Sequence, residues 1–203
     1  GIPYSVSLAG AVADADAGSV LTFSKPSGPA WLSVSSDGTL SGTPTSGDGG
    51  TNYFTVRVID AAGQNGFAVV AIPVTTLTAS DRALDDNFGI AVDVDGDTIV
   101  VGAYVDDGAV VNQGSAYVFT RTDGTWSQTA HLLPIVQQNG AGFGGAVSVE
   151  GTTILVGAYN ETVTVGGTPH TNQGAAYVYT FDENTWGLAA ILRDPSGRAY
   201  DHF

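Results

Sequence analysis

The 203-residue chain carries 20 acidic and 6 basic residues, which gives it a net charge of −14 at neutral pH. This negative field repels a phosphate backbone, so nucleic acid is excluded as a partner. The absence of cysteine excludes disulfides, thiol catalysis and thiolate-held zinc. The longest nearly apolar run, 67–74, is much shorter than the ~20 residues that a membrane-spanning helix needs, so we expect no transmembrane segment.

The composition favours strands and turns. Of the acids, 17 are Asp and 3 are Glu, and the chain has 28 glycines. Asp and Gly suit tight turns, whereas Glu suits helices. No long window shows the 3.6-residue apolar period of an amphipathic helix. The sequence therefore predicts an all-β fold.

The first part of the chain alternates short strand and turn signals. Candidate strands are 21–23, 31–34, 39–41, 53–60 and 67–74. In one of them Phe54, Val56 and Val58 share a face, as in a half-buried strand. This spacing predicts a β-sandwich over residues 1–76, and we expect Trp31 to be buried between its two sheets.

The rest of the chain repeats itself. Residues 88–104 match 143–159 at 12 of 17 positions, and 112–120 match 172–180. The period of about 55 residues divides a region 77–203 into repeats 88–142 and 143–202, with a third beginning at Phe203. Each repeat has four candidate strands, in the first 90–94, 98–103, 115–120 and 126–132.

Four antiparallel strands in a repeat of this length are typical of a β-propeller blade. Stacked β-meanders without closure are the alternative. We expect two four-stranded blades of an incomplete propeller, with the rest of the propeller missing from this chain. The free flank of the second blade should then promote self-association, through apolar positions that we expect to be poorly covered: Ile154, Val156, Tyr177 and Val178.

The repeat motifs resemble a known family. Phe88-Gly89 with Val101-Gly102-Ala103, and Phe143-Gly144 with Val156-Gly157-Ala158, are similar to the FG-GAP signature of integrin-type propellers in bacterial secreted and surface proteins. The first domain, through segments 27–34, 37–44 and 56–60, resembles bacterial putative-Ig and dystroglycan-type cadherin-like domains. The two resemblances imply an Ig/cadherin-like β-sandwich followed by FG-GAP blades.

Both resemblances imply possible calcium-binding sites. The FG-GAP resemblance implies an Asp-rich hairpin loop, but the turn that carries Asp93, Asp95 and Asp97 is too short to wrap an ion, and we interpret these acids as solvated turn residues. The cadherin-like resemblance implies a calcium site in the sandwich domain. Its candidate ligands are Asp14, Asp16 and Asp60, and the alternative is that these residues cap loops as Asx turns.

No pattern indicates catalysis. The three histidines lie far apart in the sequence, and no nucleophile elbow, metalloprotease motif or phosphate loop occurs. We therefore expect a chain that is not an enzyme and holds no cofactor apart from the candidate calcium. Aromatic residues recur at fixed repeat positions and favour core packing over a carbohydrate-stacking row: Tyr104, Tyr117, Tyr159 and Tyr177.

The leading interpretation is a non-enzymatic fragment of a large exported bacterial protein that acts at the cell surface or outside the cell. It would serve adhesion, binding a protein or glycan through propeller loops, and the repeats differ most in loops 105–111 and 160–171. Two alternatives stay open: an accessory, non-catalytic region of a secreted hydrolase, and a structural spacer in a stalk or filament.

Overall fold

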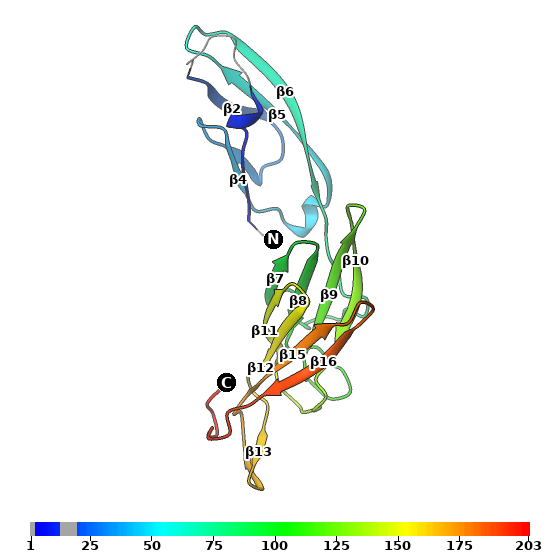
Figure 1. Cartoon of the computed structure of the whole chain (residues 1–203). Coiled ribbons are helices and arrows are strands. Elements are labelled where there is room, and N and C mark those ends of the chain that lie inside the picture. The colour runs from blue at the N-terminus through cyan, green and yellow to red at the C-terminus, as the bar shows by residue number, and fades with distance from the viewer. Residues whose placement is uncertain (1–2, 13–19) are drawn as a thin grey trace. The chain divides into compact units, whose positions relative to one another are not determined.

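The computed structural model describes residues 3–12 and 20–203 of the chain. Its regular structure is almost entirely antiparallel β-strand, which confirms the predicted all-β class. The chain divides into two compact units, Gly1–Thr76 and Leu77–Phe203 (Figure 1). Among the described residues no helix is long and apolar enough to cross a membrane.

The first unit consists of two three-stranded sheets. One sheet has the order β1-β4-β3, from Tyr4–Ser7, Thr39–Gly42 and Leu32–Val34. The other has the order β2-β5-β6, from Thr22–Ser27, Gly50–Ile59 and Asn65–Val74. Single-turn 3₁₀ helices lie at Ala9–Ala11 and Ser46–Asp48. The long β5–β6 hairpin keeps one register over ten residue pairs.

Side chains from both sheets form the core of this unit. Phe54 and Val56 of β5 face Leu32 and Leu40 of the other sheet, as the alternation in the sequence predicts. The expectation of a buried Trp31 is wrong in part. Its neighbour Leu32 is 1% exposed, whereas Trp31 is half-buried at the margin of the core.

A hydrogen bond of the indole explains why Trp31 lies at the margin of the core. Its indole Nε1–H donates to Asn52 Oδ1 at 3.3 Å, and its ring packs edge-on against Tyr4 at 6.4 Å. A ring buried wholly between the sheets would leave the indole donor without a partner. Trp31 therefore covers the core from one side while its polar atom faces the β5 strand.

The second unit contains two four-stranded sheets. The first sheet has the order β10-β9-β8-β7, from strands Ala91–Asp95 (β7), Thr98–Ala103 (β8), Ser115–Thr122 (β9) and Thr125–Leu132 (β10). The second has the order β11-β12-β15-β16, from strands Phe143–Glu150, Thr153–Ala158, Ala175–Phe181 and Trp186–Leu192. A separate hairpin, β13 (Val163–Val165) and β14 (Thr168–His170), lies between β12 and β15.

The two sheets pack face to face through a shared core. Strand β11 contacts β7 and β8, and buried residues of the first sheet such as Val100 and Val118 join Ile154, Val156 and Tyr177 of the second. The expectation that these last three residues are poorly covered is therefore wrong, because they lie on the face that the first sheet covers.

The opposite face of the second sheet carries the exposed residues. Alternate strand residues point to opposite faces, so Leu155 lies on the far side from Ile154 and is 41% exposed. Val178 pairs with Leu155 on this face and is half-buried, as expected, and Leu192 is 44% exposed.

The glycines of the repeat motif lie where the two sheets approach most closely. A β-carbon added to Gly102 would be 1.9 Å from the carbonyl oxygen of Gly144. A β-carbon on Gly144 would in turn be 2.1 Å from the carbonyl oxygen of Ser115. Because backbone meets backbone here, only glycine fits at both positions. The Phe-Gly of one repeat therefore packs against the Gly-Ala of the repeat before it.

Candidate functional site

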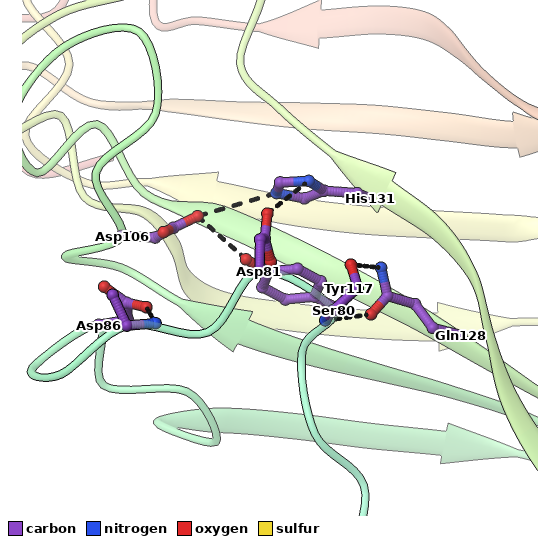
Figure 2. Close-up of polar contacts among 8 residues, drawn as sticks. Ser80, Asp81, Asp86, Asp106, Tyr117, Gln128 and His131 are labelled. Carbon is purple, nitrogen blue, oxygen red and sulfur yellow. Dashed lines mark hydrogen bonds and ion pairs between the residues drawn. The ribbon is translucent and has the colours of Figure 1, made fainter.

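In each repeat a buried carboxylate lies three residues after the Gly-Ala pair that ends the second strand of the sheet. In the first repeat it is Asp106, which is 7% exposed and whose Oδ2 accepts a hydrogen bond from the Tyr117 hydroxyl at 3.1 Å. His131, from β10, stacks on the Tyr117 ring with centroids 4.4 Å apart. Figure 2 shows the cluster, with dashed lines from the His131 ring to Asp106 and to Asp81.

The two carboxylates face different nitrogens of His131. Asp81 Oδ2 lies 3.3 Å from Nδ1, and Asp106 Oδ2 lies 3.8 Å from Nε2. Nearby, the amide of Gln128 bonds both the backbone N–H and the hydroxyl of Ser80, at 2.9 and 3.0 Å. These contacts join the segment that precedes the first sheet to its outermost strand, β10.

The second repeat has the same arrangement, with an arginine beside the buried carboxylate. Glu161 is fully buried, accepts a hydrogen bond from the Tyr177 hydroxyl and pairs with Arg193 at 2.7 Å. Glu161 follows Asp106 by the 55-residue period, whereas Arg193 has no counterpart at the equivalent position, Leu133. Each repeat thus buries a carboxylate that accepts a hydrogen bond from a tyrosine, and His131 or Arg193, at or just after the end of the outermost strand, lies beside that carboxylate.

Burial raises the pKa of Tyr117, and the carboxylates Asp81 and Asp106 add to that rise. Burial raises the pKa of Tyr177 as well, with Glu161 as the second cause. Both hydroxyls therefore stay protonated and donate to the carboxylates. A phenol held in this way is a structural donor and a poor proton-transfer group near neutral pH.

The aromatic residues of the repeats separate into two groups. Tyr117 and Tyr177 are buried in the sheets, in agreement with core packing. Tyr104 and Tyr159 are half-buried, and their rings lie 6.1 Å apart with a tilt of 46°. His202 continues this column at 6.3 Å from Tyr159. Equivalent positions of successive repeats therefore contact each other directly.

The acids of the β7–β8 hairpin do more than face solvent. Asp93 Oδ2 accepts hydrogen bonds from the Ser148 hydroxyl at 3.0 Å and from the Val149 N–H at 2.8 Å. The Val149 bond is the main cause that lowers the pKa of Asp93. Asp95 accepts from the Gly151 N–H at 2.7 Å. The interpretation of these residues as solvated turn acids is thus incomplete, because they join the first sheet to β11.

Asp97, the third acid of this hairpin, stays within its own sheet. It pairs with Arg121 of β9 at 2.6 Å, and both side chains are largely exposed. Exposed pairs of this kind contribute little to stability.

The candidate calcium ligands of the sandwich fall into two groups. Asp14 and Asp16 lie outside the described residues. Asp60 closes the β5–β6 turn, where its Oδ1 accepts from the Gln64 N–H at 2.8 Å and its backbone N–H donates to the Gln64 carbonyl at 3.0 Å. Asp60 therefore caps this loop, although over a longer span than an Asx turn, which bonds the backbone two residues on. Within 3–12 and 20–203, no three His, Asp or Glu side chains form a group that could hold a metal ion.

The loops that differ between the repeats have different structures. Residues 105–111 form turns without strands, whereas 160–171 include the β13–β14 hairpin, which extends away from the second sheet (Figure 1). The Gln138 side chain holds the base of this hairpin through two bonds to the Thr162 backbone, at 2.7 and 2.8 Å. His170 Nδ1 lies 2.6 Å from the Gly197 carbonyl oxygen.

These features define a modular all-β chain in which a two-sheet domain precedes a tandem β-repeat. Family models match both parts: "FG-GAP repeat" over residues 73–119 and 126–179, and "Putative Ig domain" over residues 1–75. The chain therefore consists of an Ig-type domain followed by FG-GAP repeats, which confirms the resemblance in the sequence motifs.

Comparisons beyond the family models add little. No curated protein sequence gives a significant match. Among solved structures, an endo-fucoidan hydrolase from glycoside hydrolase family 107 is 19% identical over 87% of this chain, with a TM-score of 0.27. A substituted form of that enzyme is 22% identical over 57% of this chain, with a TM-score of 0.28. The chain spans 23% of each of these proteins.

Proposed function

We propose that the two four-stranded sheets are consecutive blades of a β-propeller. The support comes from equivalent faces of the two sheets. In the first sheet, Val100 and Val118 are fully buried against the second sheet. Their equivalents, Leu155 and Val178, form the exposed face of the second sheet. A further FG-GAP repeat stacked on this face would bury it in the same way.

The backbone at and just before Phe143 and Phe203 supports the same arrangement. The Phe143 N–H donates to the Gln113 carbonyl at 3.1 Å, and the Phe203 N–H donates to the Gln173 carbonyl at 2.7 Å. Residues 140 and 142 have positive φ, as do Tyr200 and His202. Phe203 thus has the place on the second sheet that Phe143 has on the first, which suits the start of a third blade.

We propose further that the chain is a non-enzymatic part of an exported bacterial surface protein and binds a protein or glycan through its propeller loops. FG-GAP and Ig-like domains are typical of extracellular proteins. The observation that carries the binding proposal is the β13–β14 hairpin, because Gln138 and His170 fix its base while the tip residues Thr164 and Thr168 are exposed. Binding residues commonly lie on such loops above a rigid scaffold.

The surroundings of His131 support a non-enzymatic role. Its two ring nitrogens face the carboxylates Asp81 and Asp106, and a tyrosine ring covers one side of the imidazole. A histidine that serves as a general base must reach the proton of a nucleophile or substrate. Here the carboxylates of Asp81 and Asp106 lie beside the two ring nitrogens, at 3.3 and 3.8 Å.

A glycan array and adhesion to cultured cells test the binding proposal with the full chain. The double variant Thr164→Lys/Thr168→Lys changes the hairpin tip, and Thr122→Lys/Thr125→Lys, as a control, adds the same charge at the exposed end of β9 and start of β10. We expect the double variant to lose at least tenfold in binding while the control keeps it. Equal binding by all three proteins would contradict a role for the hairpin, and hydrolysis of any array glycan would contradict a non-enzymatic role.

A further inference from the structure

Strand β6 of the Ig-type unit presents an apolar surface with a free edge. Its sheet has the order β2-β5-β6, so among the described strands β6 is paired on one side only. On its outer face Phe67 is 64% exposed and Val69 is 71% exposed, and Tyr53 of the neighbouring strand is 65% exposed. Singly exposed apolar residues are common, but three on one sheet face beside a free edge indicate an interaction surface.

The edge lacks the features that normally prevent strand addition. Edge strands are usually shortened, bulged or charged. Strand β6 is ten residues long, pairs with β5 without a register shift and contains no charged residue. The only charged residue of β5 and β6 is Arg57 of β5, whose guanidinium lies over the Phe67 ring at 5.9 Å on the outer face of the sheet.

Pro73 shows which backbone groups face this edge. Proline has no N–H to donate, so within a sheet it is tolerated where that position points away from the neighbouring strand. Pro73 pairs with Thr51 in an unbroken register. Because backbone direction alternates along a strand, Phe67, Val69 and Ala71 also direct their N–H and carbonyl groups to the free edge.

This arrangement is complementary to itself. If Val69 pairs antiparallel with Val69 of a second copy, each Phe67 lies opposite the other copy's Ala71. About six backbone hydrogen bonds then form across the junction, and each Phe67 meets the small side chain of Ala71. The chain as a whole carries a charge of −14, which opposes self-association. Strand β6 is a surface without acids, so two copies can meet there without direct repulsion between carboxylates.

We propose that two copies of the chain dimerise through antiparallel pairing of their β6 strands, which joins the two β2-β5-β6 sheets into one six-stranded sheet. The surface is small. Two aromatic side chains per copy, each able to bury about 150–250 Å², leave the interface below the ~1,200 Å² of a standard complex. We therefore expect a weak dimer, in the class of small, transient interfaces.

Sedimentation velocity of the full chain over a 100-fold concentration range tests this proposal. We expect a monomer–dimer equilibrium that Val69→Lys shifts at least tenfold toward monomer. Val20→Lys is the matched control, because Val20 is 74% exposed and lies outside β6, and it should leave the equilibrium unchanged. Ala71→Pro removes one outward N–H without adding charge and should also weaken the dimer, with thermal melting to verify that each variant folds.

A parent chain that stays monomeric at the highest concentration overturns the proposal. So does a dimer that Val69→Lys leaves intact. Leu155→Lys probes the exposed face of the second FG-GAP sheet, and association that only this variant abolishes would place the contact there instead. A glycan or protein ligand bound by the β13–β14 hairpin is not affected by any of these β6 variants, so the two proposals fail separately.

Discussion

Replacing Gly102 by alanine should destabilise the FG-GAP unit far more than the same change at Gly157, although the two glycines occupy the same motif position. The added β-carbon at Gly102 would lie 1.9 Å from the Gly144 carbonyl oxygen, and backbone atoms cannot rotate away. The added β-carbon at Gly157 meets only the Ala146 side chain at 3.4 Å, an ordinary contact. Neither glycine has a positive φ, so alanine suits the local backbone at both positions.

The loss in free energy of unfolding expected for Gly102→Ala is caused by overpacking. Forcing a methyl group into a closed contact costs about 1–3 kcal/mol, and a clash with backbone belongs at the upper end. A loss of about 3 kcal/mol lowers the melting temperature of a unit of this size by about 10 °C. At Gly157 the change should stay within about 1 kcal/mol, because alanine also restricts the unfolded chain.

Differential scanning calorimetry of the full chain measures both variants. The transition of the FG-GAP unit should fall by about 10 °C for Gly102→Ala and by no more than a few degrees for Gly157→Ala. Melting temperatures that agree within 2 °C would refute the reasoning that the Gly102–Gly144 approach fixes the distance between the two sheets.

Three further results are expected. Millimolar calcium should leave the melting of the FG-GAP unit unchanged, because Asp93 and Asp95 already bond backbone N–H groups; a rise lost in the Asp93/Asp95/Asp97 triple alanine variant would contradict this. Trp31→Ala should cost less than the ~3–5 kcal/mol of a fully buried tryptophan, as measured by urea unfolding, because Trp31 is half-buried. The lowered pKa of Asp93 stabilises the fold above the unfolded value of about 3.9 and is lost as pH falls through the folded value, so Asp93→Asn should flatten the acid limb of a stability–pH curve below about pH 4.

The sequence predicts most of the strands because their signals are local. The alternation of Phe54, Val56 and Val58 is sufficient to place β5, and the Asp95-Gly96 turn places the β7–β8 hairpin. The β13–β14 hairpin was missed, although Gly166-Gly167 between two short strand-like segments is a hairpin signal. Its strands have three residues each, too few for a clear period.

The contacts between the sheets could not be predicted in the same way. Alternation assigns Ile154 and Leu155 to opposite faces, but it does not say which face another sheet covers. The sequence contains only a weak signal for the buried carboxylates: Asp106 and Glu161 occupy the same repeat position and both are acidic. Their burial depends on Tyr117 and Tyr177 from a distant strand, which is a property of the packed structure and not of the local sequence.

The close packing of Phe143-Gly144 against the preceding sheet has a consequence for how such chains change in evolution. Phe143 is fully buried in the core that the two sheets share, so the boundary of the sequence repeat lies inside the protein and not in a surface loop. A duplication or deletion from one Phe to the next preserves every such junction, because each repeat brings the Phe-Gly that fits the sheet before it and the Gly-Ala that receives the sheet after it. A recombination point within the loops 105–111 and 160–171 would instead join the first two strands of one repeat to the last two strands of another, so the strand pairing inside that sheet would be new.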